Sequence, residues 1–295
     1  MNGSKKHEGF EGEKLIVLPR NFLQQVSEHP LVNPLYITDI GFFPDAQFHY
    51  RERPSGSEQH ILIYCEKGKG FVEFPEKTRP IEEGTFFVIP KNTPHIYGSD
   101  EKKPWTIYWV HFLGRNAEHY FANMKAAGYI APVSLEKSYK IKFLFEDIFS
   151  FLKNGYTLDT MIYTSQVLAN LLGVFFFINN DYMLGLKGDA VRIEETIMYM
   201  ANNVELPLTL KELAAMANLS VTHYSYLFKK KTGFPPIDYF IRLKIQKACQ
   251  LIDTTDLRIN EIASKVGFKD PYYFSRAFHK IVQMSPTEYR AIKKG

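Results

Sequence analysis

The chain has 295 residues, of which 45% are hydrophobic and 23% are charged. This composition is typical of a folded globular protein and excludes a chain that is disordered throughout. Two cysteines, Cys65 and Cys249, are too few for a disulfide framework, which favours a reducing compartment. The most apolar segment, residues 167–178, contains Asn170 and is shorter than the ~20 residues of a membrane span. We therefore expect a cytoplasmic protein of about two domains, without a membrane segment or a signal peptide.

The net charge of +4 is distributed unevenly along the chain. Residues 188–295 carry 16 basic and 11 acidic side chains, a balance of +5, whereas residues 1–187 carry 20 and 21, a balance of −1. A basic module beside a nearly neutral one indicates that the last third binds a polyanion. An excess of this size also arises by chance, so the interpretation depends on the motifs.

Short strand-like segments separated by glycine and proline fill the first part of the chain. They include residues 60–65, 70–74, 85–90 and 105–112. In the last of these segments, the alternation of a strand places Trp105, Ile107, Trp109 and His111 on one face. Closely spaced strands of this kind predict a small β-barrel over about residues 15–115.

The spacing of Gly84, Pro90 and His95 resembles the second motif of the cupin family. A cupin that holds a metal needs two or three histidines and a carboxylate around one ion. The nearest approach to the first motif is His49-Tyr50-Arg51-Glu52, in which Arg51 stands where the second histidine would be. We therefore predict a cupin-like barrel that holds no metal and no other cofactor.

Residues 116–180 are predicted to form a helical hairpin with two apolar stripes. One stripe runs from Tyr139 to Leu152 and the other from Met161 to Phe175. One stripe can cover the barrel. The other either pairs with a second subunit or belongs to the same intramolecular core. We therefore expect residues 1–180 to form one domain, followed by a glycine-containing linker over 181–191.

The last third of the chain contains a repeat. Its matching positions are Leu210/Ile259, Leu213/Ile262, Ala214/Ala263 and Ala217/Val266 at an offset of 49, then Phe228/Phe278, Pro236/Pro286 and Tyr239/Tyr289 at an offset of 50. A repeat of this kind predicts one supersecondary unit that is used twice. Each copy has the pattern of two short helices with a tight turn, the form of a helix-turn-helix. The units span about 209–232 and 259–282, within an all-α domain over 192–295.

A wider set of residues in the same region has a specific pattern. It comprises Leu213-Ala214, Leu219-Ser220, Phe228-Lys229, Gly233, Ile262-Ala263, Val266-Gly267-Phe268, Tyr273-Phe274, Arg276-Ala277-Phe278 and Ser285-Pro286-x-x-Tyr289-Arg290. With this set the region resembles the DNA-binding domain of the AraC/XylS family of bacterial transcription regulators. The barrel segments resemble the effector-binding domain of the sugar-responsive branch of that family, through Arg51-x-Arg53-Pro54-x-Gly56, Leu62, Gly68-x-Gly70, Pro94-His95-x-Tyr97, Trp105 and Trp109-x-x-Phe112.

The resemblance implies an α+β fold, with a cupin-like barrel and helical hairpin before a double helix-turn-helix domain. It also implies that residues 1–180 bind the effector and dimerise. It implies three groups of site residues. Those that contact DNA bases are Thr222, Ser225, Tyr226, Pro271, Tyr272, Ser275 and Arg276; those that contact phosphates are Lys229, Lys230 and Lys280; those that bind the effector are Arg53, His95, Tyr97 and Trp109. A pocket histidine of the resembled sugar regulator falls on Ile107, so the same sugar is not implied.

Each of these assignments has a structural alternative. Arginine can bind guanine through two hydrogen bonds, but Arg276 could equally contact a phosphate or form an ion pair within its helix. Trp109 could be a core residue, and Arg53 could form a surface ion pair with Glu52 or Glu58. Tyr97 could close the end of a strand.

The sequence therefore predicts a ligand-responsive, sequence-specific DNA-binding transcription regulator and not an enzyme. The predicted effector is a sugar or related carbohydrate whose utilisation genes the protein controls. The expected partners are double-stranded DNA at the bacterial nucleoid, a second copy in a homodimer, and RNA polymerase, with no membrane. The alternative is a metal-dependent cupin enzyme fused to a DNA-binding module, against which the missing His-x-His pair argues. A DNA-repair methyl acceptor would need an activated cysteine, and neither Cys65 nor Cys249 is suitably placed.

Overall fold

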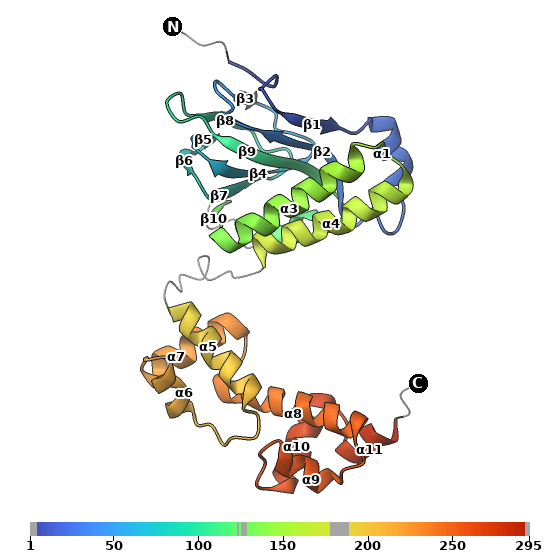
Figure 1. The fold of residues 1–295 in the computed structure, drawn as a ribbon, viewed down its shortest axis with the longest axis vertical. Coiled ribbons are helices and arrows are strands. Elements are labelled where there is room, and N and C mark those ends of the chain that lie inside the picture. The colour runs from blue at the N-terminus through green and yellow to red at the C-terminus, as the bar shows by residue number, and fades with distance from the viewer. Residues whose placement is uncertain (1–4, 123, 125–128, 178–188, 293–295) are drawn as a thin grey trace. The chain divides into compact units, whose positions relative to one another are not determined.

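The computed structural model describes residues 5–122, 124, 129–177 and 189–292. The chain forms two compact units, an N-terminal unit of residues 1–183 and a C-terminal unit of residues 184–295 (Figure 1). Within the predicted linker, residues 181–188 lie outside the described residues, and 189–191 begin helix α5 (Asp189–Asn202). No helix of the described residues is long and apolar enough to cross a membrane.

The N-terminal unit contains two antiparallel sheets. Their strands are β1 (Lys14–Val17), β2 (Tyr36–Phe43), β3 (Tyr50–Arg53), β4 (His60–Lys67), β5 (Lys69–Phe74), β6 (Lys77–Glu82), β7 (Thr85–Ile89), β8 (His95–Ser99), β9 (Thr106–Leu113) and β10 (Ile130–Pro132). The larger sheet has the order β1-β2-β9-β4-β7-β10, and the smaller has the order β3-β8-β5-β6. The cupin-like barrel that the sequence predicted is thus confirmed as a pair of facing sheets.

One prediction for the middle of the chain is wrong. Helix was expected throughout 116–180, but β10 pairs with β7, with Ala131 opposite Phe86. The reason is the free edge of β7, whose backbone N–H and C=O groups need partners. The short helix α1 (Arg20–Val26), which precedes the second strand, was not predicted.

The central strands are buried on both faces because two different layers cover them. Ile61 and Ile63 of β4 point into the core between the sheets, whereas Leu62 and Tyr64 point to the opposite face. This alternation follows from the pleat of a strand, in which successive side chains point to opposite sides. It explains why the segment 60–65 is apolar at nearly every position.

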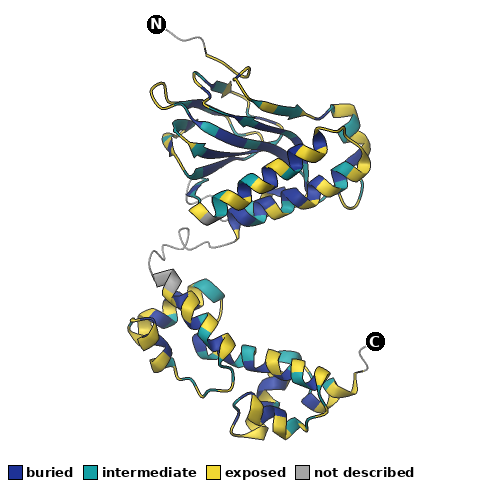
Figure 2. Ribbon diagram, viewed as in Figure 1, coloured by how far each residue is buried: buried dark blue, intermediate teal, exposed yellow. Residues whose placement is uncertain are grey.

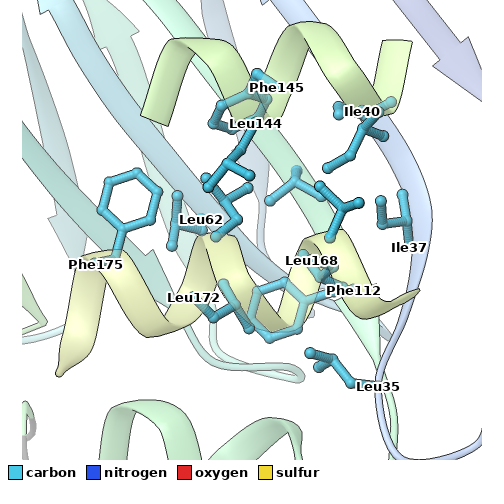
Figure 3. Packing of buried hydrophobic residues seen from close by; sticks show 14 of the residues in the cluster. Leu35, Ile37, Ile40, Leu62, Phe112, Leu144, Phe145, Leu168, Leu172 and Phe175 are labelled. Atoms are coloured by element: carbon cyan, nitrogen blue, oxygen red, sulfur yellow. The ribbon is translucent and has the colours of Figure 1, made fainter. Parts of the chain in front are cut away.

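Helices α3 (Leu135–Leu152) and α4 (Leu158–Phe176) cover the outer face of the larger sheet (Figure 1). The short helix α2 (Ala117–Phe121) adds Ala117 and Phe121 to the same core. Ser134 and Thr157 cap α3 and α4 by accepting hydrogen bonds from backbone N–H groups. Leu62 of β4 and Phe112 of β9 meet Phe145 of α3 and Leu168 of α4 in one core (Figure 3). Burial of such a side chain stabilises the fold by about 1.5–3 kcal/mol.

Both predicted apolar stripes contribute to this single intramolecular core. Ile141 to Leu152 of the first stripe and Met161 to Phe175 of the second supply buried side chains to it. Figure 2 shows that α3 and α4 turn buried residues toward the sheet and exposed residues away. Tyr139 differs from the rest of its stripe, because 66% of its surface is exposed.

The C-terminal unit consists of helices alone among its described residues. They are α5, α6 (Leu210–Met216), α7 (Val221–Thr232), α8 (Pro236–Thr254), α9 (Ile259–Lys265), α10 (Pro271–Val282) and α11 (Pro286–Ala291). The helices enclose two small cores, one around Tyr224 and Phe228 and the other around Phe274 and Phe278. Helix α8 belongs to both, because it gives Phe240 to the first core and Ile245 to the second.

The repeat in the sequence is also a repeat in the structure. Residues 208–217 and 257–266 have the same succession of buried and exposed positions, as do 221–230 and 271–280. The turns match as well, with positive φ at Asn218 (53°) and Gly267 (76°). A side chain at Gly267 would overlap the backbone carbonyl of Glu205, so this turn requires glycine.

Lys244 of α8 ties the two cores together. Its buried ammonium donates hydrogen bonds to the backbone carbonyl oxygens of Val204, Leu206 (3.1 Å) and Val266 (2.9 Å). It also lies 4.5 Å from the centre of the Phe240 ring. Burial lowers the pKa of this lysine to about 8. The carbonyls of Val204 and Leu206 lie in the segment before α6, and that of Val266 lies in the turn after α9. One side chain therefore binds segments of both helix-turn-helix units.

Candidate DNA-binding surface and barrel cavity

The second helix of each helix-turn-helix unit presents a polar face. Ser220 accepts a hydrogen bond from the backbone N–H of His223 and so caps α7, while Asp270 accepts one from that of Tyr272 and caps α10. The predicted base-contact residues that are exposed are Thr222, Tyr226, Pro271, Tyr272 and Arg276. A helix of this kind enters the major groove of DNA with its exposed side chains toward the base edges.

The two serines of the predicted set are placed differently from the others. Ser225 and Ser275 are half-buried, and each donates its hydroxyl to a carbonyl oxygen of its own helix, Val221 at 2.8 Å and Pro271 at 3.0 Å. These hydroxyl protons are engaged, which leaves only oxygen lone pairs for another partner.

Basic side chains gather beside the second unit. A cleft of about 200 Å³ between α8 and α10 is lined by Arg242, Arg276 and Lys280 together with Asp238. Among the described residues, no carboxylate lies within 4.0 Å of Arg276 or Lys280, so the intrahelical ion pair considered for Arg276 is absent. Lys229 and Lys230 of α7, the other predicted phosphate contacts, are exposed. Exposed cations with this spacing are suited to phosphate contacts.

A cavity of about 120 Å³ opens between the two sheets of the barrel. It brings together three of the predicted effector residues, Arg53 of β3, Tyr97 of β8 and Trp109 of β9. The structure also excludes the structural alternatives that were considered for Arg53 and Tyr97. Arg53 contacts the hydroxyl of Tyr97 at 3.2 Å and has no ion pair with Glu52 or Glu58, and Tyr97 lies within its strand at 4% exposure.

His95, the fourth predicted residue, lies behind the cavity wall. Its ring is stacked on Tyr97 at a centroid distance of 5.7 Å, and its Nε2 atom lies 3.4 Å from Arg53 Nη1. Burial lowers its pKa to about 4, so the ring is neutral at physiological pH. His95 therefore positions Tyr97 and Arg53 instead of lining the cavity itself.

The position of Trp109 depends on a glycine of the neighbouring strand. Gly41 of β2 pairs with Trp109 of β9, and a Cβ atom at Gly41 would overlap the indole ring. The indole lies across the strand at this point, packs against the core between the sheets and lines the cavity at once. Trp109 thus combines the core role and the cavity role that were considered as alternatives.

Sequence reasoning missed an acid–histidine pair in the cavity wall. His111 Nδ1 lies 3.4 Å from Asp39 Oδ2, and Thr38 donates its hydroxyl to the same carboxylate at 2.7 Å. Burial by itself would raise the pKa of Asp39, but the hydrogen bond from His111 and the other contacts lower it overall. Burial also lowers the pKa of His111, so a neutral imidazole donates to a carboxylate.

His49 and Arg51 also line the cavity and were not among the predicted effector residues. Arg51 carries a signal that strand alternation could have used, because it lies two residues from Arg53 and so on the same face. Asp39 and His111 are far apart in the sequence, and only the register of β2 against β9 makes them neighbours. Within the part of the chain that the structure describes, no group of three or more His, Cys, Asp or Glu side chains could hold a metal ion.

Comparison with known proteins assigns both parts of the chain. Residues 40–168 match the AraC-like ligand binding domain, and residues 213–292 match the helix-turn-helix domain. The MmsAB operon regulatory protein of Pseudomonas aeruginosa is 31% identical over 279 residues, which cover 92% of this chain and 88% of that protein. The arabinose operon regulatory protein of Escherichia coli is 26% identical over 256 residues, 81% of this chain and 83% of that protein.

The raffinose operon transcriptional regulatory protein RafR of Pediococcus pentosaceus is 24% identical, over 79% of this chain and 85% of that protein. Among solved structures, the DNA-binding domain of AdpA in complex with a target DNA is 26% identical. The match covers 34% of this chain and 90% of that chain, with a TM-score of 0.33.

A ligand-binding barrel joined to a double helix-turn-helix defines a ligand-responsive, DNA-binding transcription regulator. The matched domains and the relatives are those of regulators and not of enzymes, as the sequence predicted. The chain belongs to the AraC/XylS family of transcription regulators.

Proposed function

We propose that the barrel cavity binds a small hydroxylated effector, a sugar or related carbohydrate, and that the protein controls the genes for its use. The observation that carries the proposal is the meeting of Arg53, Tyr97 and Trp109 around one cavity between the sheets. Hydroxyl groups need polar partners, and the C–H face of a carbohydrate packs on an aromatic ring. Relatives named for the arabinose and raffinose operons agree with this class of effector.

In the proposed mechanism, the effector has different affinities for two arrangements of the chain, because a ligand shifts an equilibrium only through such a difference. Each arrangement leaves the two recognition helices able to occupy different DNA half-sites. Thr222, Tyr226, Pro271, Tyr272 and Arg276 would contact bases there, with weaker contacts from Ser225 and Ser275. Lys229, Lys230 and Lys280 would contact phosphates. The place of action is then the nucleoid in the cytoplasm, where DNA-bound protein can contact RNA polymerase.

The test is the response of DNA binding to the effector. Trp109→Ala is expected to abolish the effect of the ligand on operator affinity and to leave the affinity without ligand unchanged, because the indole lies in the barrel. Ligands are found by thermal shift, and affinities are measured on operator and random duplexes. A normal ligand response in this variant would place the effector elsewhere.

We also propose that the protein works as a homodimer, through an apolar face of α3. Leu135, Tyr139 and Phe143 lie four residues apart and are 76%, 66% and 69% exposed. Residues 136–142 at the start of this face carry three lysines and one glutamate, and its end carries Glu146 and Asp147. Within the unit Glu146 pairs with Lys14, and Asp147 accepts a hydrogen bond from Tyr163. Antiparallel packing of two copies would therefore bring opposite charges together.

Sedimentation tests this dimer. Phe143→Glu is expected to shift the protein toward monomer, because the charge would be buried against the second copy. Leu31→Glu is the matched control, since Leu31 is also an exposed apolar residue of this unit, at 53%. A dimer unaffected by Phe143→Glu would exclude the α3 face.

A further inference from the structure

The barrel cavity is lined by hydrogen-bond donors that lack acceptors. The indole N–H of Trp105 donates to His49 Nδ1 at 3.2 Å, so in neutral His49 the proton is on Nε2. Burial lowers the pKa of His49 to about 3, which keeps the ring neutral. His49 Nε2 and the indole nitrogen of Trp109 are both buried without a hydrogen-bond partner, and both residues line the cavity. Buried donors without partners are costly, so the pair points to a missing acceptor.

The two arginines of the cavity point the same way. Arg51 and Arg53 project from the same face of β3 into the cavity. Among the described residues, Arg53 has no carboxylate within 4.0 Å, and Arg51 has only Glu8, at 4.0 Å, whose side chain is 61% exposed. The remaining carboxylate in the wall, Asp39, is already hydrogen-bonded to Thr38 and His111. Glu8 and Asp39 thus supply carboxylates to the cavity wall, but among the described residues neither guanidinium group has a carboxylate closer than 4.0 Å.

We propose that the effector carries a carboxylate, and that Arg53 and Arg51 bind it. The N–H groups of His49 and Trp109 would donate to the same oxygens, and Asp39 would accept a hydrogen bond from a hydroxyl of the effector. The proposal rests on the proposed ligand-binding role of the barrel and narrows its ligand to hydroxy acids, including sugar acids. Neutral sugar hydroxyls offer acceptors, but only a carboxylate gives a guanidinium group charge-assisted hydrogen bonds to two oxygens at once.

Calorimetric titration of the full chain with matched pairs of compounds tests the proposal. The acids are glycolate, lactate, glycerate and gluconate; the neutral partners are the corresponding amides, with glycerol and L-arabinose. At least one acid is expected to bind roughly ten- to hundredfold more tightly than its amide, as for hydrogen bonds to charged groups. Arg53→Met is expected to remove this preference, and Arg53→Lys to restore part of it. Arg115→Met, an exposed arginine outside the cavity, is the control.

The outcomes separate this proposal from the function on which it rests. Tight binding of arabinose that alters DNA affinity, with no acid bound, would overturn the carboxylate and keep the sugar-responsive regulator. Equal binding of an acid and its amide, or unchanged acid binding by a folded Arg53→Met protein, would also overturn the carboxylate. Acid binding that changes with Arg53 but leaves operator affinity unaffected would support the carboxylate site and contradict the regulatory role.

Discussion

Residues 221–230 of α7 and 271–280 of α10 share every buried position but not their exposed chemistry. Where α7 has Tyr226, α10 has Arg276. Lys231 of α7 forms a 3.0 Å ion pair with Glu194, whereas the matching position in α10 is Ile281. The cleft beside Ile281 is lined by three cations and by Asp238. The repeat therefore maintains two cores, while the exposed faces of the two helices differ in their charged residues. Among the described residues Lys280 has no carboxylate within 4.0 Å, so we expect it to contribute more charge-dependent DNA affinity than the paired Lys231.

The largest expected effect comes from removing the contacts by which Lys244 links the two helix-turn-helix units. Lys244→Met would leave the carbonyls of Val204, Leu206 and Val266 without this donor and should lower the stability of the C-terminal unit by about 3 kcal/mol. Urea unfolding followed by helical circular dichroism measures the loss. Both tryptophans, Trp105 and Trp109, lie in the barrel, so their fluorescence gives the unchanged reference.

Lys247→Met is the control for that experiment, because the Lys247 ammonium contacts only the exposed Gln250 side chain, at 3.0 Å, among the described residues. If the two lysine variants lost equal stability, Lys244 would not be the link between the two helix-turn-helix units.

The second prediction compares the two recognition helices directly. Arg276→Ala should cost about 1–3 kcal/mol of operator affinity and reduce the preference for operator over random DNA, since arginine reads guanine through two hydrogen bonds. Tyr226→Ala, at the equivalent position, should cost less. Fluorescence anisotropy with both duplexes measures the pair of variants. Equal loss on operator and random DNA would assign Arg276 to phosphate instead of base contact.

The third prediction exchanges the residues that end the two helices. Gly233 ends α7 with φ of 80°, and Gln283 ends α10 with φ of 63°. A left-handed conformation is unfavourable for glutamine, so Gln283→Gly should stabilise the unit by about 1 kcal/mol and Gly233→Gln should destabilise it similarly. Changes of the same sign in both variants would show that other contacts, and not backbone conformation, decide these helix ends.

The smallest effect concerns salt dependence. Lys280 has no carboxylate within 4.0 Å among the described residues, whereas Lys231 is paired with Glu194. Lys280→Gln should reduce the slope of log affinity against log salt concentration by about 0.9, the value for one lost phosphate contact. Lys231→Gln should change the slope much less. A larger change in this slope for Lys231→Gln than for Lys280→Gln would contradict the stronger phosphate contact expected of Lys280.

The sequence predicted burial and exposure correctly where local pattern decides geometry. The burial of Tyr224 and Phe228 and the exposure of Tyr226 follow from helical spacing around a known cap. In the barrel, Arg53, Tyr97 and Trp109, which the resemblance named as effector residues, line one cavity, whereas His95 lies outside its lining. Helix was wrongly expected at Ile130–Pro132, because the partner that makes it a strand, β7, is distant in the sequence.

The sequence by itself determined the order of the parts, the repeat and the helix caps, because these depend on neighbours within a few residues. Tertiary structure decided which polar groups meet. The register of β2 against β9 joins Asp39 to His111 and makes room for Trp109 over Gly41, and the path of α8 brings Lys244 to three carbonyls. Such contacts depend on distances between segments far apart in the chain, and only strand pairing and close packing set those distances.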